Sequence, residues 1–216
     1  MRKLLWITVP ASFLIAGTGY YLINSQPMIV SSAVNMAGGP RHPVSTEMKR
    51  EADGKAGNPA PDFELPDPNG NMVKLQELLK KGPVVVVMTK DGCPCSEESQ
   101  PFFNDLYDHY KDKMSFVGMI DVDRPKAMLY EGSMGVKYPI ACETDGKTYA
   151  KYHVKQSVYT YYISQDGTLK KVWPGYWVGM LNELNQMLAD ETKIPAKTLS
   201  TKDAPEEPSS GCYLHK

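Results

Sequence analysis

The sequence carries no excess of charge of either sign, since 24 lysines and arginines oppose 25 aspartates and glutamates, for a formal net charge of −1. Nothing in this balance favours binding to nucleic acid or to an acidic partner. No internal repeat is present, and 216 residues suffice for one domain of ordinary size with appendages. Cysteine is scarce as well, the four being Cys93, Cys95, Cys142 and Cys212. Two of these lie only two positions apart, which directs attention to sulfur chemistry.

The N-terminus combines two basic residues with a long apolar segment. Arg2 and Lys3 precede residues 4–23, which are almost free of charge and, at about 1.5 Å rise per residue, long enough to span a bilayer. We predict that residues 1–23 form either a signal anchor that stays in the membrane or a signal peptide that is removed after the small residues 31–33. Both alternatives place the rest of the chain outside the cytoplasm, because the positive charges precede the span. The protein is then a single-pass protein of the cell membrane or a secreted one, in a compartment that permits disulfides.

Composition divides the remainder of the chain into three parts. Residues 24–56 contain glycine, proline and serine without a sustained period, which predicts a flexible tether. A compact domain is predicted over residues 57–191. Residues 192–216 contain three prolines and Cys212, and we predict a disordered tail without a core of its own.

Alternating strand and helix patterns predict an α/β domain. Residues 84–88 and 116–120 are apolar runs typical of strands that are buried on both faces. A helix is expected between them, from about residue 97 to 111, and its apolar stripe comprises Phe102, Phe103, Leu106, Tyr107 and Tyr110. A strand hairpin is predicted over residues 159–173, followed by an amphipathic helix around residues 181–188. This order predicts a mixed sheet with helices on both faces.

The cysteine pair lies where the first of these strands ends and a helix begins. Cys93 and Cys95 flank Pro94, and Ser96 with the two glutamates after it has the hydroxyl and the acidic residues of a helix start. Backbone N–H groups and the positive end of the helix dipole favour negative charge there, so a thiol ionises more easily. A thiolate attacks disulfides and peroxides, and it binds soft metals.

Taken together, these features resemble the thioredoxin-like superfamily, in particular the redoxin branch that holds membrane-tethered thioredoxin-like proteins and the peroxiredoxins of the alkyl hydroperoxide reductase/thiol-specific antioxidant group. The resemblance covers about residues 57–190. It rests on the opening at 57–63, the Val-rich strand leading to Cys93-Pro94, Glu97-Glu98 followed by Pro101, Tyr152-His153-Val154, and residues 161–167. It implies a thioredoxin-like fold and a thiol-dependent oxidoreductase without a prosthetic group, in which Cys93 is the nucleophile.

Near the thiols the sequence departs from the patterns of both subfamilies. The second cysteine of thioredoxin-like reductases falls on Ser96, so Cys95 or Cys212 has to resolve the mixed disulfide or sulfenic acid formed at Cys93. Peroxiredoxins place threonine or serine three residues before the attacking cysteine, whereas this chain has Lys90 there. The arginine position of peroxiredoxins and the cis-proline position of thioredoxins both fall on Val158. The expected partners are a disulfide-bearing protein or a hydroperoxide, together with an upstream thiol reductant.

Two other functions stay open at this point. Cys93 and Cys95, with or without His153, could bind Cu(I) in a copper-binding assembly factor or chaperone of this fold, because Cu(I) prefers soft thiolates. Alternatively, the domain is an interaction module that kept the fold without the chemistry. Cys142 follows a short extended segment, and we expect it in the core or in a structural pairing rather than in catalysis.

Overall fold

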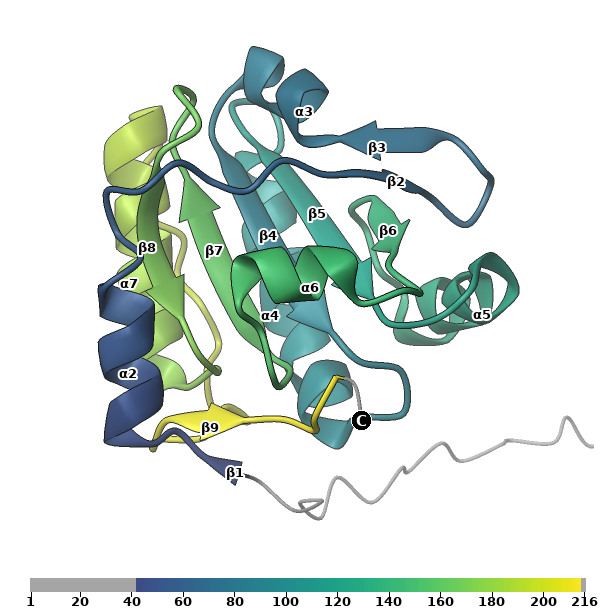
Figure 1. The fold of residues 1–216 in the computed structure, drawn as a ribbon. Helices are drawn as coiled ribbons and strands as arrows, with labels where there is room; N and C mark the ends of the chain where they lie inside the picture. The colour runs from purple at the N-terminus through teal and green to yellow at the C-terminus, as the bar shows by residue number, and fades with distance from the viewer. Residues whose placement is uncertain (1–41, 215–216) are drawn as a thin grey trace, which may run out of the picture. The chain divides into compact units, whose positions relative to one another are not determined.

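The computed structural model describes residues 42–214, and a five-stranded sheet in the order β6-β5-β4-β7-β8 lies at its centre (Figure 1). In chain order its strands are β4 (Val84–Thr89), β5 (Ser115–Ile120), β6 (Ile140–Cys142), β7 (Tyr159–Ile163) and β8 (Leu169–Trp173). β4 and β6 pair in parallel with β5, whereas β7 runs antiparallel to β4 and β8. The predicted mixed sheet is confirmed. A separate hairpin joins β2 (Glu64–Pro66) to β3 (Met72–Lys74).

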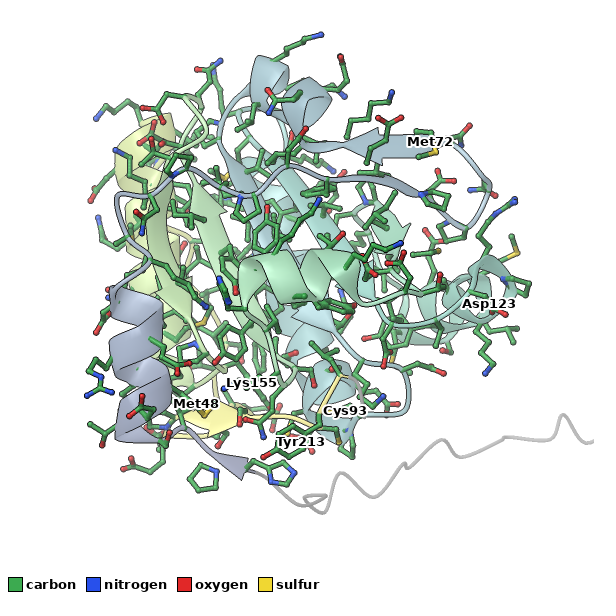
Figure 2. All side chains as sticks on the ribbon, viewed as in Figure 1. Met48, Met72, Cys93, Asp123, Lys155 and Tyr213 are labelled. Carbon is green, nitrogen blue, oxygen red and sulfur yellow. The ribbon has the colours of Figure 1, made fainter. Side chains whose placement is uncertain are left out.

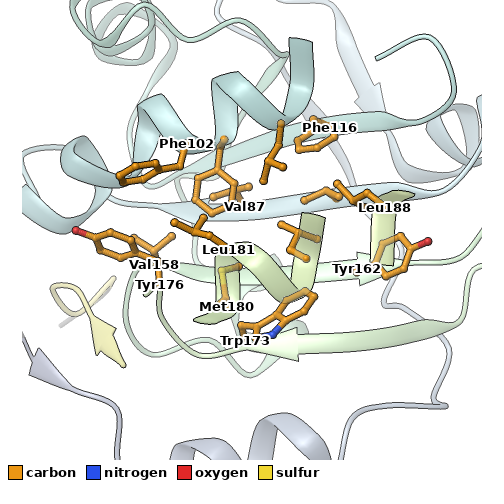
Figure 3. Close-up of a cluster of buried hydrophobic side chains, with 14 of the residues drawn as sticks. Val87, Phe102, Phe116, Val158, Tyr162, Trp173, Tyr176, Met180, Leu181 and Leu188 are labelled. Atoms are coloured by element: carbon orange, nitrogen blue, oxygen red, sulfur yellow. The ribbon is translucent and has the colours of Figure 1, made fainter. Parts of the chain in front are cut away.

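Helices cover both faces of this sheet (Figure 1). They are α2 (Thr46–Asp53), α3 (Leu75–Lys81), α4 (Pro94–Tyr110), α5 (Arg124–Met134), α6 (Lys147–Tyr152) and α7 (Val178–Thr192). α4 and α7 cover one face, and their buried side chains share a cluster with Tyr162 and Trp173 (Figure 3). α2, α3 and α6 contribute to a second cluster, on the other face.

β4 requires a layer of helices on each face of the sheet, because its side chains on both faces are buried. All six of its residues are buried, and successive side chains of a strand point to opposite faces. Val85 and Val87 belong to the cluster that contains Leu106 and Leu184. Val84 and Val86 belong to the cluster on the other face. An uninterrupted apolar strand has to be covered on both sides, which is why this run predicts the three-layer arrangement.

The second half of the predicted tether, residues 42–56, is not a flexible segment in the structure. Residues 1–41, with the predicted membrane span or signal peptide, lie outside the described residues. Residues 42–56 pack on the domain: Ser45 caps α2 by accepting a hydrogen bond from the Met48 N–H at 3.1 Å, and Ala52 is 1% exposed. Two apolar contacts, Met48 and Ala52, are too few to form a recognisable period. No helix within residues 42–214 is both long enough and apolar enough to cross a membrane.

The C-terminal residues also differ from the expected disordered tail. β9 (Ser209–Ser210) pairs with β1 (His42–Pro43), and Ser209 exchanges two backbone hydrogen bonds with Tyr176, at 2.8 and 3.3 Å. Ser210 and Leu214 are buried. The tail has no core of its own, but it is ordered by pairing with backbone far away in the sequence. A local sequence pattern does not report such pairing.

Candidate active site

Cys93 lies at the N-cap of α4, directly after the loop that leaves β4. Its carbonyl accepts hydrogen bonds from the N–H groups of Ser96 and Glu97, at 2.9 and 3.1 Å. The helix therefore begins three residues before the expected start, and Ser96 is not its cap. The Ser96 hydroxyl oxygen instead accepts the N–H of Lys90 at 3.0 Å, which closes the loop that carries the thiol. The predicted placement of Cys93 at the positive end of a helix is confirmed.

Hydrogen-bond donors enclose the sulfur of Cys93, whose residue is 0% exposed. Ser157 Oγ and the backbone N–H of Cys212 each donate to Cys93 Sγ at 3.2 Å. The thiol of Cys95 also donates and has the largest effect, so that together these groups lower the pKa of Cys93 to about 3 against the opposing effect of burial. Cys93 is therefore a thiolate at neutral pH.

The negative charge of Cys93 keeps the neighbouring thiols protonated. The hydrogen bond that Cys95 donates to Cys93, and next its burial, raise the pKa of Cys95 far above the ordinary value. Burial, followed by the hydrogen bond to Cys93, raises the pKa of Cys212 to about 11. The site thus holds one thiolate in hydrogen-bond contact with two thiols. The structure brings together all three cysteines that the sequence predicts for the reaction.

Cys212 reaches the site on a C-terminal arm, defined here as residues 209–214. The arm pairs antiparallel with residues 155–157: the Ser157 N–H donates to the Cys212 carbonyl at 2.9 Å, and the Gly211 N–H donates to the Ser157 carbonyl. Farther along, the Leu214 N–H donates to the carbonyl of Lys155 at 3.0 Å. Figure 2 shows Cys93, Lys155 and Tyr213 at the same end of the domain. The arm therefore lies over the thiolate.

Sequence reasoning missed two residues of the site, Ser157 and Gly211. Ser157 is joined to Val158 by a cis peptide bond, at the position where the resemblance expects the cis-proline of thioredoxins. That correspondence was the available signal that the residue before Val158 faces the nucleophile. At Gly211, a Cβ atom would lie 2.8 Å from Cys93 Sγ and would also collide with Ser157 Oγ. A lone glycine beside a cysteine gives no comparable signal.

The remaining candidate residues do not join this cluster. Cys142 lines a separate cavity of about 700 Å³ beside Asp123 and Met128, and burial raises its pKa to about 11. It is buried and forms no disulfide, as expected for a core cysteine and not for a structural pairing. His153 ends α6, where its carbonyl accepts a hydrogen bond from Lys55 Nζ at 3.4 Å. Lys90 Nζ forms an ion pair with Asp121 at 2.6 Å.

Of the residues considered as copper ligands, the structure brings together Cys93 and Cys95 but not His153. Among residues 42–214, no three or more His, Cys, Asp or Glu side chains are arranged to hold a metal ion. Cys93 and Cys95 contact each other, but His153 belongs to a different cavity, lined also by Lys55 and Tyr161.

Residues 56–172 match the model of the AhpC/TSA family. Over 122 residues the chain is 30% identical to the thiol-disulfide oxidoreductase ResA of Bacillus subtilis (strain 168), a match that covers 55% of this chain and 67% of that protein. ResA of Geobacillus kaustophilus (strain HTA426) is 27% identical over 121 residues, or 55% of this chain and 69% of the relative. The chain thus spans about two thirds of the length of these relatives.

Solved structures agree with this family. Peroxidoxin BcpB from Mycobacterium tuberculosis superposes with a TM-score of 0.54 and 25% identity, over 65% of this chain and 97% of that one. A candidate thiol:disulfide interchange protein, DsbE, from Chlorobium tepidum superposes with a TM-score of 0.59 and 23% identity, over 63% of this chain and 97% of that one. The second likeness supports the thioredoxin-like fold alone. On the strength of the family match, the relatives and the thiolate at the helix start, the chain belongs to the AhpC/TSA family of thioredoxin-like redoxins and is a thiol-dependent oxidoreductase.

Proposed function

We propose that Cys93 exchanges thiols with the disulfide of a protein substrate and that Cys212 resolves the mixed disulfide. The observation that carries this proposal is the contact between the two cysteines: the backbone N–H of Cys212 donates to Cys93 Sγ at 3.2 Å, which places the resolving residue directly against the nucleophile. A thiolate next to a second, protonated thiol is the pair that thiol exchange requires.

The exchange takes place in two steps. The Cys93 thiolate attacks one sulfur of the substrate disulfide, which forms a mixed disulfide and releases the other substrate sulfur as a thiolate. Cys212 then loses its proton to that released thiolate or to water, and it attacks Cys93 Sγ. This second attack frees the remaining substrate thiolate and leaves a Cys93–Cys212 disulfide. The substrate has gained two electrons, and an upstream dithiol has to return two electrons to the protein.

Cys212 is a better resolving residue than Cys95 for a geometric reason. Cys95 lies in the first turn of α4, two residues from Cys93, and a disulfide between them would close a very small ring at the helix start. Cys212 lies on an arm that is bound to the domain by a few backbone pairs. In this proposal Cys95 supplies the hydrogen bond that keeps Cys93 ionised.

Peroxide reduction is a second candidate, which the low pKa of Cys93 favours. Cys93 would attack a peroxide oxygen to give a sulfenic acid and an alcohol or water, and Cys212 would then form the disulfide with release of water. The arginine of peroxiredoxins has no counterpart in the described part of the chain, however. Arg50 pairs with Glu47, and Arg124 donates to the carbonyl of Pro68. We therefore rank disulfide exchange first.

We further propose that the protein works outside the cytoplasm, tethered to the membrane by its N-terminus. The basis is the sequence alone: two basic residues followed by the apolar residues 4–23. Fractionation of cells that produce the full chain, with and without a wash at alkaline pH, tests this part. Release of the protein by the wash, or its recovery with cytoplasmic markers, would contradict tethering.

Disulfide mapping by mass spectrometry tests the reaction. The reduced, metal-free protein is mixed with one equivalent of either oxidised glutathione, which is a small linear disulfide, or hydrogen peroxide, and the products are trapped with acid. We expect a Cys93–Cys212 disulfide from oxidised glutathione, a stable mixed disulfide between Cys93 and glutathione in the Cys212→Ser variant, and neither product in Cys93→Ser. Full turnover by Cys93→Ser would reject Cys93 as the nucleophile. A Cys93–Cys95 product that forms equally fast in Cys212→Ser would transfer the resolving role to Cys95.

A further inference from the structure

The C-terminal arm covers the site as an added strand covers the edge of a sheet. Its backbone bonds with Ser157 use both the N–H and the C=O of that residue, and Gln156 faces Tyr213 in an antiparallel bridge. These are the bonds by which a protein captures an extended peptide at an exposed strand edge. Residues 155–157 therefore offer backbone groups with which an extended segment in the same register can pair.

The arm also contributes to the burial of Cys93. The groups that contact its sulfur include the N–H and thiol of Cys212, and Gly211 packs against it so closely that a Cβ atom would lie 2.8 Å away. The proposed reaction, however, requires the sulfur of another protein to reach Cys93. The arm and a protein substrate cannot occupy the same edge at the same time.

We propose that the C-terminal arm is an internal copy of a substrate segment: it occupies residues 155–157 as an extended, cysteine-bearing segment of the substrate protein would, and it competes with that segment for Cys93. This inference rests on the proposed thiol exchange. It gives the end of the chain a regulatory role, because the arm has to leave residues 155–157 before a substrate cysteine can take the place of Cys212.

The residues of the arm indicate which segments bind best. The position before the cysteine has to be glycine, since a side chain at Gly211 meets both Ser157 and Cys93. The second position after the cysteine favours an aliphatic side chain, because Leu214 is 2% exposed and joins the cluster that contains Val154 and Tyr159. The position between them can hold any side chain, because Tyr213, which occupies it in the arm, is 60% exposed. The expected recognition sequence is thus glycine, cysteine, any residue, aliphatic residue.

A peptide without a thiol tests docking separately from chemistry. The probe is acetyl-Ser-Ser-Gly-Ser-Tyr-Leu-amide, which copies the arm with serine in place of cysteine, and its binding to the full chain is measured by calorimetry. In Gly211→Val the arm cannot close, whereas Gly132→Val places the same side chain in open space on α5 and serves as the matched control. We expect the probe to bind Gly211→Val at least about tenfold more tightly than the parent or Gly132→Val, because the competing arm is gone. A probe with valine in place of glycine should not bind.

Several outcomes would overturn the inference. Equal binding to Gly211→Val and the parent, or binding to neither, would show that the arm does not occupy a docking site. Unchanged hydrogen-exchange protection of the Cys212 amide in Gly211→Val would show that the glycine is not required. Leu214→Ala releases the arm without touching the site, so it replaces Gly211→Val if that variant does not fold. Because the probe carries no thiol, loss of docking leaves the role of Cys93 untouched, and turnover in Cys93→Ser rejects the reaction without affecting the binding result.

Discussion

Ser157 donates a hydrogen bond from its hydroxyl to the sulfur of Cys93 at 3.2 Å, although the two residues are 64 positions apart in the chain. Cys93 follows the end of β4, and Ser157 precedes the start of β7. The antiparallel pairing of these two strands, with Met88 opposite Tyr159, fixes the two loops against each other. The thiolate is thus stabilised by the sheet as well as by its own helix.

Replacement of Ser157 by alanine should raise the pKa of Cys93. A hydrogen bond to the charged form favours that form, so its loss favours the thiol, by about one to two pKa units given the strength of hydrogen bonds to charged groups. The ultraviolet absorbance of the thiolate, recorded during an acid titration of the reduced protein, measures this shift. Ser133→Ala is the control, because the Ser133 hydroxyl bonds only its own helix, at the carbonyl of Tyr130. An identical titration of both variants would remove Ser157 from the site.

The stability of the reduced protein should depend on pH through Cys93. The folded pKa of about 3 lies far below the unfolded value of about 8.5, so the unfolded state binds more protons between these limits. The free energy of unfolding of the parent, relative to Cys93→Ser, should therefore rise with pH between about 4 and 8, by at most about 1.4 kcal/mol per pH unit. This contribution is fully present above the unfolded pKa and disappears as the pH falls toward the folded one. Urea unfolding of both proteins across this range measures the difference, and parallel curves would contradict a depressed pKa.

Cys142 should react slowly with alkylating reagents at neutral pH. Its pKa of about 11 leaves roughly a hundredfold less thiolate than an ordinary cysteine has, and its side chain is buried. The rate of alkylation, followed by mass spectrometry of the Cys142 peptide, should increase with pH up to about 11. Cys142→Ser should retain the turnover of the parent. A strong loss of turnover in that variant would place Cys142 in the reaction.

Replacement of Gly175 by alanine should loosen the C-terminal arm. A Cβ atom at Gly175 would lie 2.8 Å from the carbonyl carbon of Ser209, in backbone that has little room to move. We expect the free energy of unfolding to fall by about 1–3 kcal/mol, as is usual for overpacking. Amide exchange of Ser209 and Cys212 should become faster. Gly132→Ala, in open space, is the control, and equal exchange rates in the two variants would show that the contact at Gly175 does not hold the arm.

Most of the sheet could be predicted because its buried strands are continuous apolar runs in the sequence. The run at residues 84–88 and the stripe from Phe102 to Tyr110 are confirmed as β4 and the inner face of α4. α2, α3 and α6 were not expected. α6 has Gly146 and no hydroxyl at its N-cap, and α2 has two apolar contacts. Such short helices are stabilised by the surface they pack on, which a local pattern does not contain.

The residues of the site likewise fall into those that the sequence predicts and those that it does not. Cys93 and Cys95 could be placed, because the end of a buried strand and the start of a helix are both visible in the sequence. The contact with Cys212 could be proposed only from the resemblance, since 119 residues separate it from Cys93. Ser157 pairs with the backbone of the arm, and Gly211 lets the arm approach Cys93 Sγ closely. Both contacts form only when loops that are distant in the sequence come together. The expected disorder of the tail failed for the same reason.

The enclosure of Cys93 has a consequence for the durability of the protein. Cysteines that react as thiolates are vulnerable to successive oxidation, and the sulfinic and sulfonic acids formed in this way are usually not recovered. A sulfur with 0% exposure is shielded from that loss whenever the arm is in place. The arm that shields this sulfur also carries a second thiol, Cys212, which can convert an early oxidation product at Cys93 into a recoverable disulfide. One short segment at the end of the chain would thus both limit the oxidation of the thiolate and reverse its first stage.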